Sequence, residues 1–328
     1  MEGMKRKLEK KGSGESIMTS GFMCPCHGFM ADGELASFQQ FKAGKNREGW
    51  FTNDDLVKQL NACMPMMRKL HPNMDLVFAF DNSMTHRAAP PDGLDARKLN
   101  LSDGGKNVPL LRSTTFVNAQ GVTVHQSMET AAGVQKGLRT ILTERGKFTN
   151  NFGHELKKMC HPCGKFRGEE LKEYQESTPQ CCGTRVLSEE PDFARQKEYL
   201  AEEVEKWEGC TIIFFPKYHC ELNFIEMVWG WTKSYHRRNR TYNFKDLERE
   251  LPVTYTTRLP LDFVQKAFMY CLRFMSGYRE GLVGPELDYA VKKYRGHRSI
   301  PVGQLALIKA EFEKKHERKA SAGSKRKR

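Results

Sequence analysis

The sequence predicts a protein of the α/β class, and two apolar runs followed by acidic residues carry that prediction. Five apolar residues at Leu76–Phe80 stop at Asp81, and a second run at Cys210–Phe215 leads to Glu221 and Glu226. Unbroken runs of this length, rich in Val, Ile and Phe, are typical of buried strands. Carboxylates that follow such strands lie where open α/β sheets bind their ligands, although an Asp here could also cap the next helix.

The remaining elements follow in order from turn signals and apolar spacing. Broken apolar stretches at 16–41 predict a strand pair or hairpin, with Ser16–Met23 as the first strand. Thr52 or Asn53 is a candidate N-cap for a helix whose Met side chains fill the core. Further helices are expected at Glu129–Arg145, at Phe193–Trp207, from Glu226 to about Arg240, at Leu261–Tyr278 and at Leu287–Tyr294.

Composition favours a polyanionic partner. Of the 328 residues, 53 are Lys or Arg and 40 are Asp or Glu, so the net charge is +13. Such an excess suits nucleic acid, although general solubility also accounts for it. No apolar run approaches the roughly 18 residues that cross a bilayer, so no membrane partner is expected. The charged start of the chain lacks the apolar core of a signal peptide, and the ten Cys are therefore expected to be reduced thiols or metal ligands.

Two acidic residues on neighbouring elements are candidates for metal chemistry. Asp81 ends one strand and Glu226 lies on the element after the other, so the pair could hold divalent cations between them. Carboxylate oxygens suit Mg²⁺ or Mn²⁺. Two such ions, roughly 3.5–4 Å apart, perform phosphoryl transfer in many enzymes.

Several sequence blocks, in the same order, resemble the mariner-like DDE transposases, and more narrowly their fungal members. The blocks are FAFDNS-x-x-H, H-x-ELN-x-IE-x-x-W followed by a Lys, GKNREGWFTNDDLVKQL, ARKLNLSDGGKN, CCGTRVLSEEPDF, and GYREGL with DYAVKKYRGHR. They cover about residues 15–300. The resemblance implies a ribonuclease-H-like mixed sheet flanked by helices, a large insertion before the last catalytic strand and a helical C-terminal region.

The resemblance also implies roles for particular residues. Asp81 and Glu226 match the second and third catalytic acids, which bind two Mg²⁺ or Mn²⁺ ions for DNA cleavage and strand transfer. Glu221 matches an acid that precedes the third ligand and ranks below Glu226. Asn82 and His86 are expected to orient Asp81 or a scissile phosphate, unless Asn82 only shapes the turn.

The first catalytic acid is where the sequence departs from the family pattern. The family tends to have an Asp after the Ser of the first strand, whereas here Ser20 is followed by Gly21. The nearest acids, Glu15 and Asp32, would need a shifted register to point at Asp81. The alternative to an active transposase is therefore a catalytically inactive or domesticated DNA-binding protein derived from a transposon.

The expected domain organisation has six segments. They are a disordered basic arm at 1–14, the first part of the ribonuclease-H-like domain at 15–92, an insertion at 93–208, the second part at 209–245, a helical region at 246–300, and a charged helix with a disordered basic tail at 301–328. Related transposases carry a helix-turn-helix region before the catalytic domain. We therefore expect this chain to be the catalytic part of a longer element or a truncated copy.

Four cysteines of the insertion are candidate zinc ligands. Cys160 and Cys163 form a C-x-x-C pair, and Cys181 and Cys182 follow. A C-x-x-C pair can close on a structural zinc with two further thiolates, and His161 could replace one Cys of the pair. The rival interpretation is a set of buried thiols, because neighbouring side chains such as 181 and 182 diverge in a strand.

Three further candidate ligands lie in the first hairpin. Cys24, Cys26 and His27 leave a tetrahedral zinc one ligand short, so a tight turn is the favoured interpretation.

Basic residues outline candidate DNA contacts. Those in the insertion helix and just after it, Lys136, Arg139, Arg145 and Lys147, form either a surface that follows phosphates or a solvated face. The main candidates are Arg237, Arg238 and Arg240 at the end of one helix, and Lys292, Lys293, Arg295 and Arg298 near another. The first group could also complement its helix dipole. Expected partners are double-stranded DNA and, in a homodimer, a second copy, and the K/R-rich tail indicates a nuclear location.

Overall fold

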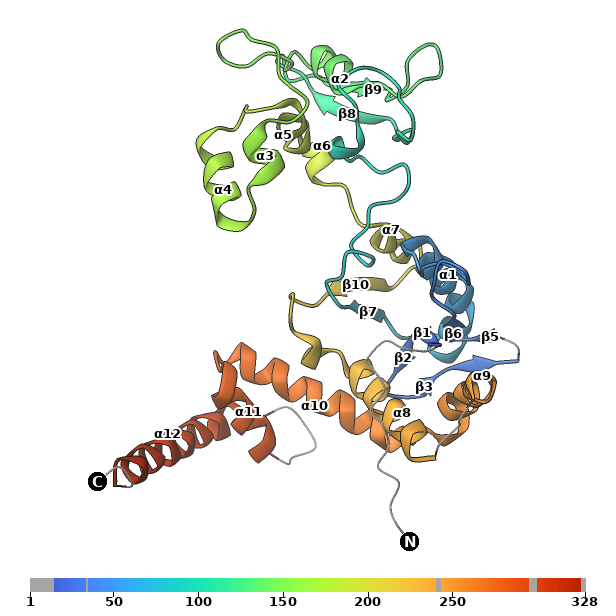
Figure 1. Ribbon diagram of the computed structural model, residues 1–328, viewed down its shortest axis with the longest axis vertical. Coiled ribbons are helices and arrows are strands. Elements are labelled where there is room, and N and C mark those ends of the chain that lie inside the picture. Colours follow the sequence, from blue (N-terminus) through green and yellow to red (C-terminus); the bar gives the residue numbers. More distant parts are fainter. Residues whose placement is uncertain (1–14, 34, 240–242, 295–299, 326–328) are drawn as a thin grey trace. The chain divides into compact units, whose positions relative to one another are not determined.

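The computed structural model describes residues 15–33, 35–239, 243–294 and 300–325 (Figure 1). The chain divides into two compact units: residues 1–86 with 203–328, and residues 87–202. The second unit lies within the region 93–208 that the sequence marked as an insertion, except for its first six residues. The expected arm at 1–14 lies outside the described residues.

The strands of the first unit form small paired sheets. β1 (Met18–Gly21) pairs antiparallel with β6 (Phe38–Phe41), β2 (Met23–Cys24) with β3 (Gly28–Phe29), and β4 (Ala31–Asp32) with β5 (Leu35–Ala36). β7 (Leu76–Phe80) pairs in parallel with β10 (Cys210–Phe214). In the described part of the chain these are separate two-stranded sheets, where the sequence suggested one mixed sheet. Phe22, between β1 and β2, connects the first strands to β7, because its ring packs edge-to-face on Phe78 and Phe80 at centroid distances of 6.2 and 6.1 Å.

Helix α1 (Asn53–Leu70) packs against the first strands. Thr52 is its N-cap, and Thr52 and Asp55 form a capping box, which confirms the predicted start of the helix. Gln59 donates to the carbonyl oxygens of Ser20 and Ser37, at 3.2 and 3.3 Å, and so ties the middle of the helix to the strands. The buried methionines that the sequence assigned to the core are Met64, Met66 and Met67.

The C-terminal part of the first unit is helical. Its elements are η2 (Cys220–Leu222), α8 (Phe224–Asn239), α9 (Phe244–Val253), the single turn η3 (Thr254–Arg258), α10 (Leu261–Arg279), α11 (Gly284–Lys293) and α12 (Val302–Lys325). Helix α12 continues through Lys325, although the sequence suggested disorder from Ala320. Ala and Lys favour helix, which accounts for the longer element. None of the helices in the described ranges has the length and apolar character that a membrane crossing requires.

The second unit has its own core. Its elements are η1 (Ala96–Lys98), the antiparallel pair β8 (Thr114–Val117) and β9 (Thr123–Gln126), α2 (Leu138–Glu144), α3 (His161–Lys165), α4 (Gly168–Ser177), α5 (Gly183–Ser188), α6 (Pro191–Ala194) and α7 (Tyr199–Glu205), which runs into the first unit. Met128, Leu138, Ile141, Leu142 and Leu187 are fully buried at its centre.

Two predicted helices in this region are shorter than expected. The helix expected at Glu129–Arg145 begins only at Leu138, because a turn with Gly133 at φ 74° closes a bridge between Glu129 and Gln135. The helix expected at Phe193–Trp207 is split into α6 and α7.

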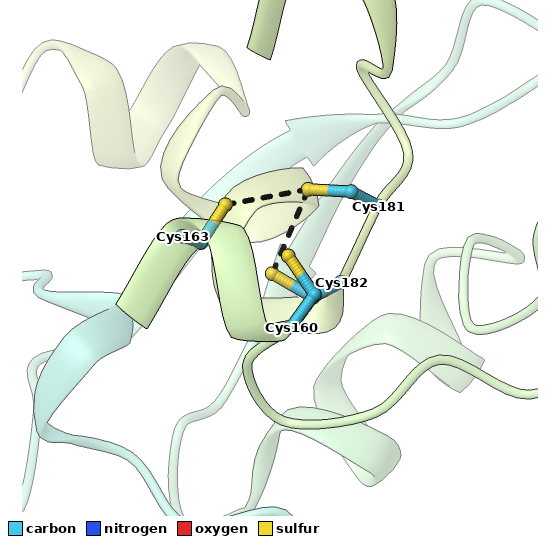
Figure 2. Close-up of side chains that lie close together, drawn as sticks. All are labelled: Cys160, Cys163, Cys181 and Cys182. Carbon is cyan, nitrogen blue, oxygen red and sulfur yellow. Dashed lines mark hydrogen bonds between the residues drawn. The ribbon is translucent and has the colours of Figure 1, made fainter. Parts of the chain in front are cut away.

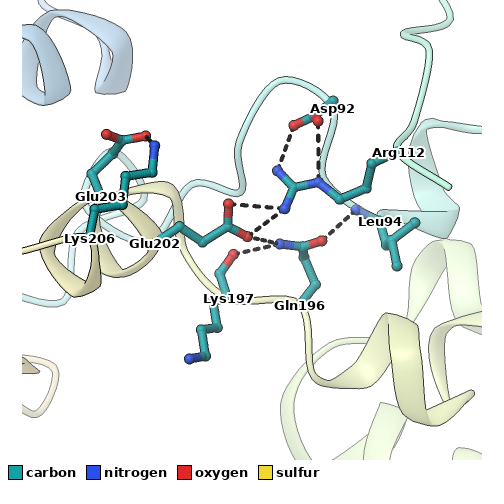
Figure 3. Close-up of polar contacts among 8 residues, drawn as sticks. All are labelled: Asp92, Leu94, Arg112, Gln196, Lys197, Glu202, Glu203 and Lys206. Carbon is teal, nitrogen blue, oxygen red and sulfur yellow. Dashed lines mark hydrogen bonds and ion pairs between the residues drawn. The ribbon is translucent and has the colours of Figure 1, made fainter. Parts of the chain in front are cut away.

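Polar contacts join the two ends of the second unit (Figure 3). Arg112 bridges Asp92 and Glu202, at 2.6 and 2.9 Å. Gln196, between α6 and α7, accepts a hydrogen bond from the amide of Leu94 and donates to Glu202, each at 2.8 Å. The segments that enter and leave the unit are thus held together.

The mixed α/β class predicted from the sequence is confirmed, with a large insertion between the two parallel strands and a helical C-terminal region. The sheets and flanking helices are consistent with a ribonuclease-H-like domain.

Candidate functional site

The two parallel strands end together. Phe80 is the register partner of Phe214, and the amide of Phe215 donates to the carbonyl oxygen of Phe80 at 2.8 Å. Asp81 follows directly after β7, and the segment that leads to Glu226 follows directly after β10. Both acidic segments therefore leave the strands at the same end, as the positions of the apolar runs predicted.

Asp81 is held by a histidine of its own turn. The Nδ1 atom of His86 contacts Oδ1 of Asp81, whose side chain is 53% exposed. The His86 ring also packs on Phe80, with 5.1 Å between ring centroids. Asn53, the first residue of α1, donates to the carbonyl oxygen of Thr85 at 2.6 Å and anchors the turn from the other side. The sequence pointed to His86 but gave no sign of Asn53, which lies 32 residues before Thr85.

Asn82 lies in the same turn, outside regular structure, and its side chain has no hydrogen-bond partner in the described residues. Its expected role in orienting Asp81 remains a prediction.

Glu226 lies in the first turn of α8 with an exposed side chain. Its amide donates to the carbonyl oxygen of Asn223 at 3.1 Å, and the Asn223 side chain accepts weakly from the amide of Ile225 at 3.4 Å. Within the described ranges the carboxylate of Glu226 makes no hydrogen bond or ion pair. The N-terminal turn of a helix favours such an anionic group.

Glu221 is engaged in internal contacts. Its Oε1 accepts from the hydroxyl of Tyr278 at 2.6 Å and lies 2.7 Å from His219 Nδ1. Burial raises the pKa of the Glu221 carboxyl, but these hydrogen bonds outweigh it and hold that pKa below its usual value. A carboxylate with both partners in place is less available to a cation than the unpaired Glu226.

The position expected to carry the first acid is filled by an aromatic ring. A Cβ atom on Gly21 would lie 2.7 Å from Cε1 of Phe29 and 3.1 Å from Cβ of Phe38. Phe29 is 6% exposed and packs in one buried cluster with Tyr255 and Val228. Gly21 therefore faces an apolar core.

The two neighbouring acids pair elsewhere. Glu15 lies 2.9 Å from Arg47, and Asp32 lies 2.6 Å from Lys69. Glu15 precedes β1, and Asp32 lies on β4 opposite Leu35 of β5. The expectation that neither acid replaces the first one easily remains a prediction.

The four cysteines of the second unit converge (Figure 2). The sulfur atoms of Cys160, Cys163, Cys181 and Cys182 all lie within 4.8 Å of one another, with 3.4 Å between Cys163 and Cys181 and 3.9 Å between Cys181 and Cys182. Cys160 and Cys182 are the N-caps of α3 and α5, so the chain turns at both places. That turn is why the adjacent Cys181 and Cys182 do not diverge as they would in a strand.

The cluster favours one thiolate. Burial raises the pKa of the Cys160 thiol, but hydrogen bonds from Cys163 and Tyr174 bring it down to about 7. Burial raises the pKa of Cys163 and, more strongly, that of Cys181. Cys160 is thus the thiol of this group that ionises near neutral pH.

The basic residues at the end of α8 are exposed. Arg237 forms no ion pair with the described residues, and Arg238 donates from Nη2 to Ser234 Oγ at 2.8 Å. Arg240 lies outside the described residues. Both described arginines can reach an external anion.

The second basic group is partly neutralised. Lys292 is exposed on α11, whereas Lys293 pairs with Glu311 of α12 at 3.1 Å. Arg295 and Arg298 lie outside the described residues.

The four basic residues expected in and just after the insertion helix are all engaged in ion pairs. Each pairs with a carboxylate: Lys136 with Glu144, Arg139 with Glu155, Arg145 with Asp192, and Lys147 with Glu190. Arg145 is fully buried, which excludes it from DNA contact and corrects the expectation of a basic helix face.

Comparisons with known proteins bear on one segment of the chain. No curated protein and no solved structure gave a match. One family model matches, and its members generally use divalent metals. Residues 189–248, which carry β10, Glu221 and Glu226, match the family described as DDE superfamily endonuclease, a match that supports a transposase or nuclease function.

Proposed function

We propose that this chain is a DDE-type transposase or endonuclease domain in which Asp81 and Glu226 bind two divalent cations for DNA cleavage and strand transfer. The parallel register of β7 and β10 is the observation that supports this most directly, because both acidic segments begin at the same end of the strands. The match to the DDE family covers the second segment and includes Glu226.

The side chains available there fit a hard cation. Asp81 is about half exposed and Glu226 is exposed, so both carboxylates are accessible. Next to the Asp81–His86 turn, Asn53 donates from Nδ2 to the carbonyl oxygen of Thr85, and its Oδ1 is buried without a hydrogen-bond partner among the described residues. Oxygen donors of this kind suit Mg²⁺ or Mn²⁺. Such cations activate the attacking water or 3′-hydroxyl and stabilise the leaving oxygen.

Other side chains of the site would position the reactants. The contact of His86 with Oδ1 of Asp81 restricts the orientation of that carboxylate. Arg237 and Arg238 are exposed at the far end of the helix that carries Glu226 and would bind phosphates of double-stranded DNA.

Metal-dependent nicking of supercoiled DNA tests the proposal. We expect nicking with Mg²⁺ or Mn²⁺, and its loss in Asp81→Asn and Glu226→Gln. Glu313→Gln, an exposed acid on α12, is the matched control and should keep wild-type activity. Equal activity in wild type and Glu226→Gln would overturn the assignment of Glu226.

A second candidate, a catalytically inactive DNA-binding protein derived from a transposon, is favoured by the packing of Phe29 against Gly21. It predicts DNA binding without nicking at any concentration of either metal. Calorimetry with Mn²⁺ separates the two: binding lost in Asp81→Asn supports a metal site, and no binding supports the inert protein.

We further propose that Cys160, Cys163, Cys181 and Cys182 bind a structural zinc. Sulfur atoms around a tetrahedral zinc lie roughly 3.8 Å apart, close to the observed separations of 3.4 and 3.9 Å. Zinc content per chain should fall by one in Cys160→Ser and stay unchanged in Cys220→Ser, an exposed cysteine outside the group. Unchanged zinc in folded Cys160→Ser would remove this site.

The sequence blocks support a narrower assignment to the fungal mariner-like transposases, and the K/R-rich tail supports a nuclear location. Localisation of a tagged chain with and without residues 324–328 tests the latter. Light scattering of the DNA complex tests the proposed homodimer.

A further inference from the structure

A second group of potential metal ligands lies in the first unit and includes neither Asp81 nor Glu226. Cys24 Sγ is 3.5 Å from Nδ1 of His27 and 3.7 Å from Nε2 of His71. The rings of the two histidines are 4.9 Å apart, and all three donor atoms lie within 4.8 Å of one another. Around a tetrahedral zinc, sulfur and nitrogen ligands are roughly 3.6 Å apart.

His71 supplies a nitrogen ligand from outside the hairpin, which alone offers only three ligands. It is the C-cap residue of α1, 47 residues after Cys24. The position of α1 is fixed by the bonds of Gln59 to the carbonyl oxygens of Ser20 and Ser37, on either side of the hairpin in sequence. The approach of His71 to Cys24 is therefore imposed by the packing of a helix on the strands.

Cys26 is the candidate for a fourth donor, and its exposed thiol lies outside the 4.8 Å group that the other three donors form. It lies in the same turn between β2 and β3, two residues after Cys24, and is exposed. With His27 next in the chain, the turn offers two thiols and one imidazole, and His71 brings the total to four. Two sulfur and two nitrogen donors are a common set for tetrahedral structural zinc.

We propose that Cys24, Cys26, His27 and His71 form a zinc site that joins the β2–β3 turn to the C-terminal end of α1. The metal would cross-link the first hairpin to the helix whose other end anchors the Asp81–His86 turn through Asn53. This site is independent of the proposed catalytic function and of the cysteine cluster in the second unit.

Elemental analysis of the full chain purified with zinc tests the site by difference. His71→Asn and Cys24→Ser should each lower the zinc content by one atom per chain, whatever the content of the other cluster. His154→Asn, an exposed histidine of the second unit, and Cys220→Ser are matched controls and should retain the wild-type content. Wild-type zinc content in both folded variants would overturn the proposal.

A second measurement needs no variant. In the wild-type chain, alkylation followed by mass spectrometry should label Cys24 and Cys26 slowly with zinc bound and rapidly after chelation. Cys220 serves as the internal reference, since its rate should not change. Equal labelling of Cys24 and Cys26 with and without zinc would show that no metal is bound there.

Discussion

The phenyl ring of Phe29 occupies the space beside Gly21, where a Cβ atom would lie only 2.7 Å from Cε1 of the ring. Phe29 is held in place by Trp229, whose ring stacks on it at 5.5 Å, and by Tyr255 at 4.9 Å. Aromatic side chains thus occupy the space beside Gly21. An acidic side chain at residue 21 would require this cluster to repack.

Gly21→Asp should destabilise the chain. The new side chain would collide with a buried ring and place a carboxylate in an apolar cluster, and overpacking alone costs about 1–3 kcal/mol. We expect a lower urea midpoint at unchanged m-value, with no gain in Mn²⁺ affinity. Gly303→Asp on α12 is the control, because a Cβ there meets nothing within 4 Å. Full stability in Gly21→Asp would mean that Phe29 can move aside.

Local signals in the sequence were sufficient for much of the fold. Thr52 and Asp55 form the capping box at the start of α1 within one turn, and the apolar runs form the predicted strands β7 and β10. The expectation that both strands are buried was wrong, because their alternate side chains face outward and Val77 and Ile213 are 62% and 44% exposed. The sequence could therefore predict the mixed α/β class and the strand end that carries Asp81.

The features that the sequence could not predict depend on contacts between residues far apart in the chain. Nothing near His71 marks it as a neighbour of Cys24, because only the packing of α1 brings the two together. Arg145 looked like part of an exposed helix face, yet its partners Asp192 and Glu190 lie more than forty residues further along the chain.

Arg145→Met should strongly destabilise the second unit. The guanidinium forms two hydrogen bonds to Asp192, at 2.9 and 2.7 Å, and lies 4.8 Å from the ring centroid of Phe116. Its removal leaves the buried Asp192 carboxylate without its cation, which typically costs about 3–5 kcal/mol. Arg139→Met, which removes an exposed pair with Glu155, should cost less than about 1 kcal/mol. Hydrogen exchange resolved over residues 87–202 measures both, and similar exchange in the two variants would contradict this role.

The same ion pair predicts a dependence of stability on pH. Burial raises the pKa of Asp192, but the hydrogen bonds from Arg145 outweigh it, so the pKa in the folded chain lies below that in the unfolded chain. The ionised form therefore contributes stability above the unfolded pKa of about 3.9, and this contribution is lost as the pH falls through the folded pKa. The unfolding free energy of wild type should exceed that of Asp192→Asn at pH 7, and the gap should narrow below about pH 4. A gap that is constant with pH would exclude this linkage.

The exposed arginines at the end of α8 predict how DNA binding responds to salt. Arg237 and Arg238 are exposed, and Arg238 donates only to Ser234 among the described residues, so both can bind phosphates. Removing one cation that neutralises a phosphate should reduce the slope of log affinity against log salt by about 0.9. The double variant Arg237→Ala/Arg238→Ala should therefore bind random duplexes more weakly and with a slope smaller by about 1.8, as measured by fluorescence anisotropy.

Arg97→Ala is the control for this experiment, because the Arg97 guanidinium is exposed but already paired with Asp95 at 2.9 Å. Its removal should leave both affinity and slope close to wild type, since a paired guanidinium displaces few counterions from DNA. A weakening that differs between duplexes of different sequence would instead mean that the α8 arginines read bases. An unchanged slope in the double variant would mean that the DNA backbone does not pass this end of the helix that carries Glu226.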